Sequence, residues 1–249
     1  MRRLLIFTVI GVAWAGAASP AAAAGPLLPD LGMAKLSTVR IDTTTMPGHR
    51  LLRYTAVLVN VGPGPFEVIG SRLDTSTPDM SVVQRVYDSS GSHTDTLVGT
   101  VMDYAGDGHT HWHTEGIEGG TLVRLDNGVK VGTLAKHGFC FFDNVKYRLT
   151  LPDAPQSAAY VQPPSCSPKQ PNALTTSMGL SVGWGDSYPA STALQWIDIT
   201  GLPNGKYRLT ATADPGHVVG ETSYANNSTW ARIRITSDRV SVLQYGPGA

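Results

Sequence analysis

Short apolar runs separated by turn-forming residues restrict the fold of this 249-residue chain more than any other feature. Within the runs, apolar and polar side chains alternate with a period of two, which is typical of a half-buried β-strand. Many of the 27 glycines and 17 prolines lie between the runs, where they favour turns. No segment carries a convincing helical stripe over three turns. We therefore predict an all-β fold, an antiparallel β-sandwich with long irregular loops.

Several local patterns support this prediction. Residues 121–131 predict a hairpin around Asn127-Gly128, because Asn-Gly favours a type I′ turn. The six prolines between residues 152 and 172 predict an irregular loop. Lys-Tyr-Arg-Leu-Thr occurs at residues 146–150 and again at 206–210, and both copies are interpreted as strands. The other predicted strands are residues 51–61, 66–69, 81–87, 195–199, 207–212 and 230–235.

The first 24 residues are predicted to be a signal peptide. Arg2 and Arg3 form a basic start, residues 4–15 an apolar stretch, and Ala22-Ala23-Ala24 a small-residue cleavage site. The apolar stretch is shorter than the about 20 residues of an ordinary membrane span, so an uncleaved anchor is the minor alternative. Residues 25–249 are then expected to form one soluble domain that is secreted from the cell.

The charge balance gives no sign of a nucleic-acid or membrane-surface partner. The chain has 19 basic and 19 acidic residues, and loss of Arg2 and Arg3 with the signal peptide leaves a small negative charge. Nucleic-acid binding would require a cluster of lysines and arginines, which the sequence does not contain. We expect no nucleic-acid partner and no membrane span.

Cys140 and Cys166 are the only cysteines. In an exported protein, two cysteines most often pair with each other. A bridge between them would close a loop of about 26 residues and contribute about 3 kcal/mol in the chain-entropy model. It would also restrain the proline-rich segment between them.

Three histidines, His109, His111 and His113, alternate within five residues. In an extended segment this spacing puts all three imidazoles on one face. Three imidazoles are a common set of ligands for zinc, copper, nickel or iron. A flat strand would separate the outer two Cβ atoms by about 13 Å, so the segment must curl, and Gly106 and Gly108 permit that. We predict a metal site, with a solvated histidine-rich loop as the alternative, and the spacing does not identify the metal.

Three blocks, in this order, resemble the catalytic domain of the lysyl oxidase family. His109–His113 resembles the His-x-His-x-His copper motif of that family. Leu134–Cys140 resembles the segment that holds the cofactor-forming lysine. Gly179–Tyr188, followed by the segment 195–200, resembles the part that holds the cofactor-forming tyrosine. The likeness extends over about four fifths of the chain after the signal peptide, and the ordered set is far more specific than any one block.

The resemblance implies a copper- and quinone-dependent amine oxidase. The three histidines would hold Cu(II), and Lys136 and Tyr188 would form a lysine tyrosylquinone. Asp186 matches the acid that serves as base in the family, and in an extended backbone it shares a face with Tyr188. The implied reaction converts primary amines, either peptidyl lysine or small amines, to aldehydes with O2 as co-substrate and release of H2O2 and ammonia.

The sequence also departs from the family and leaves alternatives open. Trp184 and Leu194 occupy positions where the animal enzymes carry cysteines. The main alternative is a non-catalytic secreted module that binds copper or zinc. A zinc hydrolase would need a base, for which only Glu115 and Glu118 lie near the histidines, without a recognised spacing. A plain immunoglobulin-like module would have to treat the histidines as incidental.

Overall fold

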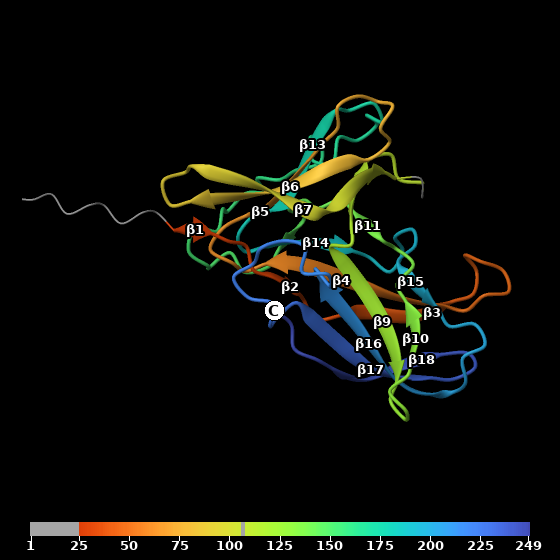
Figure 1. Ribbon diagram of the computed structural model, residues 1–249. Coiled ribbons are helices and arrows are strands. Elements are labelled where there is room, and N and C mark those ends of the chain that lie inside the picture. Colours follow the sequence, from red (N-terminus) through yellow and green to blue (C-terminus); the bar gives the residue numbers. More distant parts are fainter. Residues whose placement is uncertain (1–24, 106–107) are drawn as a thin grey trace, which may run out of the picture.

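The computed structural model describes residues 25–105 and 108–249. The predicted signal peptide lies outside the described residues. Within these ranges the regular structure consists of β-strands arranged in three sheets, and every strand pairing in them is antiparallel (Figure 1). The all-β prediction is confirmed, although three sheets take the place of the two expected of a simple sandwich.

The largest sheet contains the strand that ends the histidine motif. Its strands follow the order β11-β8-β7-β6-β5-β13, and β1 pairs with β6. Figure 1 shows this sheet at the top of the molecule, above the other two. The bounds are β1 (Pro26–Leu27), β5 (Phe66–Ser71), β6 (Met80–Asp88), β7 (His93–Tyr104), β8 (Trp112–Glu115), β11 (Gly138–Phe139) and β13 (Thr175–Leu180).

The second sheet has the order β10-β9-β16-β17-β18. It contains the predicted hairpin, and Gly128 has a positive φ of +71°. The predicted type I′ turn is absent, because Asn127 lacks the positive φ that this turn requires and Arg124 pairs with Val129 across a four-residue loop. In β16 the inward positions Tyr207, Leu209 and Ala211 are buried and alternate with more exposed residues. The bounds are β9 (Glu118–Arg124), β10 (Lys130–Thr133), β16 (Gly205–Ala213), β17 (Ser228–Ile235) and β18 (Val240–Tyr245).

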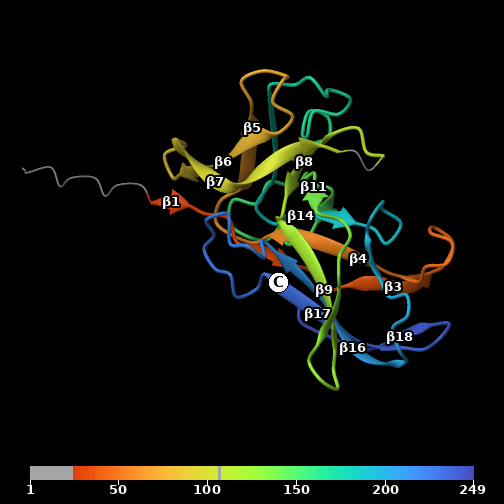
Figure 2. The same cartoon turned by 45° about the vertical axis from the view of Figure 1, so that its right-hand side comes forward.

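The third sheet is built around β4, which lies between the other two sheets in both views (Figures 1 and 2). Most of β4 is buried, as expected of a strand covered on both faces, and β14 and β15 pair with it. The bounds are β2 (Leu31–Met33), β3 (Ser37–Asp42), β4 (Leu51–Asn60), β12 (Val145–Lys146), β14 (Trp184–Tyr188) and β15 (Trp196–Asp198).

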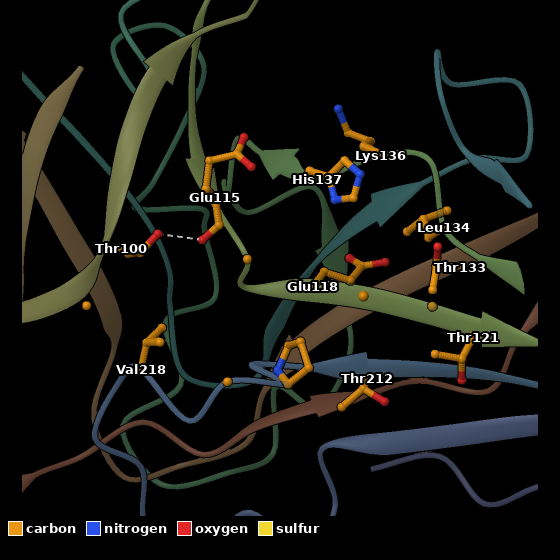
Figure 3. Close-up of a pocket in the computed structure, with 16 residues that line it drawn as sticks. Thr100, Glu115, Glu118, Thr121, Thr133, Leu134, Lys136, His137, Thr212 and Val218 are labelled. Atoms are coloured by element: carbon orange, nitrogen blue, oxygen red, sulfur yellow. Dashed lines mark hydrogen bonds between the residues drawn. The ribbon is translucent and has the colours of Figure 1, made fainter. Parts of the chain in front are cut away.

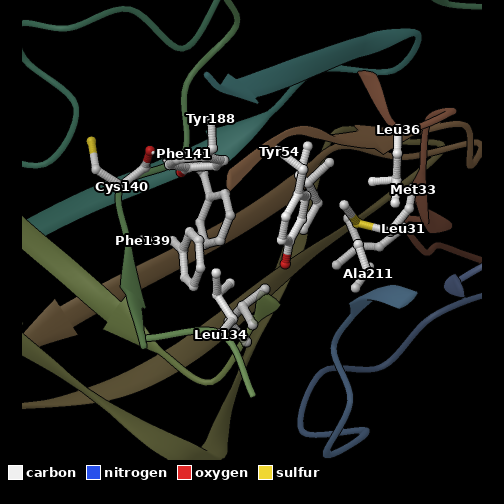
Figure 4. Packing of buried hydrophobic residues seen from close by; sticks show 14 of the residues in the cluster. Leu31, Met33, Leu36, Tyr54, Leu134, Phe139, Cys140, Phe141, Tyr188 and Ala211 are labelled. Atoms are coloured by element: carbon white, nitrogen blue, oxygen red, sulfur yellow. Dashed lines mark hydrogen bonds between the residues drawn. The ribbon is translucent and has the colours of Figure 1, made fainter. Parts of the chain in front are cut away.

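Side chains from all three sheets meet in one hydrophobic cluster. Figure 4 shows Tyr54 of β4 between Met33 on one side and the aromatic group of Phe139 and Tyr188 on the other. Each fully buried large apolar side chain contributes about 1.5–3 kcal/mol relative to its exposed state. The segments that carry Phe139 and Tyr188 are therefore held by the core itself.

One predicted strand requires correction, and several strands, β7 among them, were not predicted. Of the segment 146–150, only Lys146 is in a strand, because the backbone then turns so that Tyr147 and Arg148 both donate to the carbonyl of Gly183. β7 carried no apolar alternation because most of its side chains are exposed, and it was not predicted as a strand. The proline-rich loop was predicted correctly, since no strand lies between residues 147 and 174 of the described chain.

The Cys140–Cys166 disulfide is present. It fixes the proline-rich loop beside the histidine strand, where Trp112 N donates to the carbonyl of Cys166 at 2.9 Å. The amide of Cys166 in turn donates to Ser177 of β13. The bridge therefore holds the segment after Lys136 against the segment that carries the histidines.

Among residues 25–105 and 108–249 there is no helix of the length and apolarity needed to cross a membrane.

Candidate active site

The three histidines converge at the start of β8. His113 lies in the strand, whereas His109 and His111 lie in the loop before it. Gly108 has a φ of +92°, so the chain curls at one of the two glycines expected to permit it. Trp112 points the opposite way, where its buried indole N–H donates to the carbonyl of Gln170 at 3.0 Å. The buried tryptophan thus anchors the loop with the imidazoles on its other face.

The donor set fits a transition metal. The ligand nitrogens of His109, His111 and His113 all lie within 4.8 Å of one another, and Nε2 of His111 and Nε2 of His113 are 3.0 Å apart. Metal–imidazole bonds are about 2.0 Å long, so small side-chain rotations would bring all three nitrogens onto one ion. Neutral imidazole suits Cu(II) and Zn(II) alike.

Lys136 is a buried lysine with 2% of its surface exposed. Its backbone is fixed by the preceding residues, since Leu134 N donates to the carbonyl of Gly120 and Ala135 N to that of Trp196. The Nζ atom lies 5.3 Å from the centre of the Phe139 ring. Long charged side chains seldom bury their charged ends without a specific environment, so Lys136 is not an ordinary solvated strand lysine.

Tyr188 and Asp186 lie on the same face of β14, as the period of a strand requires. The Tyr188 hydroxyl is 2.7 Å from both Asp186 Oδ2 and the carbonyl oxygen of Cys140. The tyrosine ring packs edge-to-face on Phe139, with 4.9 Å between ring centres. Phe139 is therefore a common neighbour of the Lys136 amine and the Tyr188 ring.

Burial changes the protonation of the acidic groups in this region. It raises the pKa of Asp186 to about 8, against the opposing effect of hydrogen bonds from Tyr188 and Asn144. It also raises the pKa of Glu118 to about 8, helped by the charge of Asp186 and opposed by that of Lys136. The pKa of Tyr188 lies well above its ordinary value, because burial and the adjacent Asp186 both disfavour the phenolate. The carboxyl groups of Asp186 and Glu118 therefore gain and lose their protons near neutral pH rather than near pH 4.

A pocket of about 140 Å³ brings together all six residues predicted to form the metal and amine-oxidising site. They come from three separate sequence segments. The lining residues are His109, His111, His113, Lys136, Cys140, Phe142, Asn144, Asp186, Ser187, Tyr188 and Thr192.

Sequence reasoning missed two contributors. Asn144 donates to Asp186 and accepts from Ser187 N at 2.9 Å, but it lies in an irregular segment without a recognisable motif. Glu118 was considered only as a base for a hydrolase. Its alternation with the buried positions Gly120 and Leu122 in β9 was the signal that it faces inward. His137, beside Lys136, is exposed.

Comparison with known proteins connects this geometry to one family. The family model named Lysyl oxidase matches residues 161–245. Protein-lysine 6-oxidase of Rattus norvegicus is 43% identical over 58 residues, which are 23% of this chain and 14% of the relative. Lysyl oxidase homolog 2 of Gallus gallus is 32% identical over 135 residues, 54% of this chain and 15% of the relative.

Over the matched residues the chain is similar to the lysyl oxidases. The resemblance predicted from the sequence is thereby confirmed. The family model covers Asp186 and Tyr188, whereas the histidines and Lys136 lie before the matched residues. The alignments span only 14% and 15% of the length of these two relatives. The names of those proteins describe an oxidoreductase that acts on protein lysine.

Proposed function

We propose that the chain is a secreted, copper-dependent amine oxidase that converts primary amines, in peptidyl lysine or small molecules, to aldehydes with release of H2O2 and ammonia. In this proposal residues 1–24 are a signal peptide and residues 25–249 form a single domain. The observation that carries the proposal is the shared pocket of the three histidines, Lys136, Asp186 and Tyr188. A module that only bound metal would have no need of the lysine and tyrosine in that pocket.

The residues of the chain would divide the work as follows. The three histidines would hold Cu(II), and Lys136 and Tyr188 would be the precursors of a lysine tyrosylquinone. Together the metal and the quinone would supply the oxidising power for the amine. Phe139, which contacts both precursors, would orient the Tyr188 ring relative to the Lys136 amine. The disulfide would keep the Lys136 segment beside the histidines.

Asp186 would act as the general base. In its carboxylate form it could accept a proton from a group in the pocket, and it accepts a hydrogen bond from the hydroxyl of Tyr188, whose ring would react. Its pKa of about 8 lies close to physiological pH, where a general base is both available and strong. Asn144 would keep the carboxyl group in this orientation.

The test is the intact and peptide mass of the full chain after loading with copper in air. A cross-linked peptide that joins Lys136 to an oxidised Tyr188 is expected. Lys136→Ala and Tyr188→Phe should both lack it, and so should wild-type protein loaded with zinc. Two unmodified peptides from protein with stoichiometric copper would refute the oxidase proposal and favour the metal-binding module.

A further inference from the structure

A larger pocket of about 600 Å³ lies beside the site just described, and Lys136 lines both. Its rim is exposed at Gly99, Thr133 and Pro215, whereas Glu118 is buried inside it. The larger pocket therefore connects solvent with a buried carboxyl group next to the candidate active site.

Glu118 is the distinctive feature of this pocket. Figure 3 shows its side chain rising from β9 into the space bounded by Glu115, His137 and Leu134. Only 3% of its surface is exposed, and neither carboxylate oxygen has a hydrogen-bond partner among the described residues. Native structures rarely leave a buried carboxyl group without partners, and a polar site next to a roomy cavity is one that ordered water can occupy. Both oxygens of Glu118 are thus available to exchange protons with water.

Asp186 and the ring of Tyr54 project from the same face of the third sheet. Tyr54 and Leu58 are four residues apart in β4, so their side chains share a face. Asp186 of β14 lies opposite Leu58 in the antiparallel pairing, and residues opposite each other project to the same side. The Tyr54 hydroxyl is buried and has no hydrogen-bond partner in the part of the chain that the structure describes. This face therefore presents a carboxyl group and an unpaired hydroxyl.

The inward face of β9 packs against this face. Glu118 and Gly120 are two residues apart in β9, and both are buried. A Cβ atom at Gly120 would lie 2.1 Å from the Tyr54 hydroxyl, so the two faces are in contact there. After burial, the charge of Asp186 is the largest influence on the pKa of Glu118, and the charge of Glu118 adds to the effect of burial in raising the pKa of Tyr54. Glu118, the Tyr54 hydroxyl and Asp186 therefore lie in one buried layer between two sheets.

The smaller pocket needs a path for protons. The Tyr188 hydroxyl donates to Asp186 Oδ2 at 2.7 Å, and only 1% of the surface of Asp186 is exposed. The pKa values of Asp186 and Glu118 are both about 8, raised chiefly by burial, so a proton passes between these groups at little cost in free energy. Lys136 favours the ionised form of Glu118, which is the form that accepts a proton.

We propose that Glu118 is a proton-relay residue, which carries protons between Asp186 and solvent in the larger pocket by way of a water molecule at the Tyr54 hydroxyl. The Tyr188 hydroxyl gives its proton to the Asp186 carboxylate. Asp186 passes a proton through the water to one oxygen of Glu118, and Glu118 releases a proton from its other oxygen to water in the larger pocket. Both carboxyl groups return to the ionised form, and the net change is a Tyr188 phenolate and one hydrated proton.

The relay rests on the proposed function for its purpose. A tyrosine that is oxidised to a quinone must lose its hydroxyl proton, and a general base must give up the proton that it has accepted before it can act again. Glu118 lines the larger pocket whereas Tyr188 lines the smaller one, so Glu118 would act through Asp186. The proton movement itself requires neither metal nor O2, and it can therefore be measured in the metal-free chain.

The test is the rate at which the Tyr188 hydroxyl exchanges its proton with solvent. The full metal-free chain is labelled with carbon-13 at the tyrosine Cζ atoms and studied by NMR in mixed H2O and D2O, where a slowly exchanging hydroxyl gives separate signals for its two isotopic forms. Tyr188→Phe identifies the signal of Tyr188. Glu118→Gln keeps the shape of the side chain but cannot carry a proton, and it should slow the exchange by about tenfold or more, as expected for loss of a positioned proton acceptor. Glu118→Asp should restore the rate to within about threefold of wild type, because it keeps the carboxyl group.

Two controls separate a relay from a general change in the fold. Tyr207 is an internal reference, because it is buried, its hydroxyl donates to the carbonyl of Pro203 at 2.6 Å, and it lines neither pocket. Glu67→Gln is the matched variant, since Glu67 is also buried but accepts from Tyr87 and Tyr160 away from both pockets. The exchange rate of Tyr207 should be the same in every variant, and that of Tyr188 should be unchanged in Glu67→Gln.

A second variant decides the matter if Glu118→Gln does not fold. Tyr54→Phe keeps the buried ring and removes only the hydroxyl that holds the water, so it should slow the exchange at Tyr188 by about threefold or more. Unchanged exchange at Tyr188 in folded Glu118→Gln, or in Tyr54→Phe if Glu118→Gln fails to fold, would overturn the relay. A single averaged Tyr188 signal in both wild type and Glu118→Gln would overturn it too, because protons would then reach the site freely without Glu118.

The outcomes separate the relay from the proposed function. Glu118-dependent exchange at Tyr188 in a chain that never forms the Lys136–Tyr188 cross-link would support the relay and refute the oxidase. A chain that forms the cross-link, but whose Tyr188 exchange is unaffected by Glu118→Gln, would support the oxidase and overturn the relay.

Discussion

The buried carboxyl group of Glu118 makes the stability of the copper-free protein depend on pH in a way that one substitution can isolate. Its pKa is raised from 4.5 to about 8, first by burial and then by the charge of Asp186, while Lys136 opposes the shift. Because the folded-state value lies above the unfolded-state value, the fold holds the proton more tightly than the unfolded chain does. The stability contributed by neutral Glu118 is therefore complete below 4.5 and is lost as pH rises to about 8.

The size of this effect follows from the two pKa values. One pKa unit corresponds to about 1.4 kcal/mol, so full ionisation of Glu118 lowers the free energy of unfolding by about 5 kcal/mol. The loss is about 1 kcal/mol at pH 5 and about 4 kcal/mol at pH 7.4. Glu118→Gln does not titrate. The free energy of unfolding of this variant, relative to wild type, should thus rise by about 3 kcal/mol between pH 5 and pH 7.4.

The assay is urea denaturation of both copper-free proteins at several pH values from 5 to 9. Asp186 titrates in both proteins and its charge is coupled to that of Glu118, so the same comparison is repeated in an Asp186→Asn background. Asp238→Asn is the control, because Asp238 is exposed beside Arg239, its pKa is lowered, and it is ionised throughout this range. A difference between Glu118→Gln and wild type that stays constant with pH would show that Glu118 is solvated, and the reasoning would fail.

Three further stability predictions can be checked by the same denaturation method. Cys140→Ser opens the loop closed by the disulfide and should cost about 3 kcal/mol, with no further loss when reductant is added. Gly120→Ala forces a methyl group against a buried hydroxyl and should cost about 1–3 kcal/mol, whereas Gly99→Ala should stay within about 0.5 kcal/mol. Asp42→Ala leaves the buried Arg53 guanidinium without the carboxylate that lies 2.6 Å from its Nε and should cost about 3–5 kcal/mol.

Each of these predictions has a result that would contradict it. Cys140→Ser protein as stable as wild type would mean that the fold alone restrains the proline-rich loop. Equal stability of the two glycine variants would mean that the core beneath β9 yields to an added methyl group. A loss below about 1 kcal/mol for Asp42→Ala would place the ion pair in the range of exposed salt bridges.

The sequence predicted the fold class and the composition of the site for different physical reasons. Buried strands such as β4 were visible because burial requires apolar side chains in a continuous or alternating pattern. The hairpin was visible because Asn-Gly marks a turn between two strands, although the loop that forms is longer than the predicted two-residue turn. β7 was not, since its side chains face solvent and its place in the sheet depends on backbone pairing with β6 and β8.

The candidate site shows the same division. The histidines are close in sequence, so their convergence needed only a curl of the chain. Lys136 and Tyr188 line one pocket and have Phe139 as a common neighbour, an arrangement that depends on long-range packing and that residue spacing alone could not predict. Asn144 has no motif at all and is placed by the pairing of β12 with β14. The period of β9 could have predicted that Glu118 faces inward. That its carboxylate oxygens have no hydrogen-bond partner among the described residues could be seen only in the structure.

Lys136 is a single side chain shared by two cavities of different character, and this limits how the protein can vary. Any change at this position, by substitution or by covalent capture, reshapes the metal side and the solvent side together. The residues at the rim of the larger cavity do not line the smaller one. We expect natural or engineered variants to reshape the larger cavity through the residues around Gly99, Thr133 and Pro215, and to keep the lysine fixed. The larger cavity could then vary while the smaller one keeps its shape.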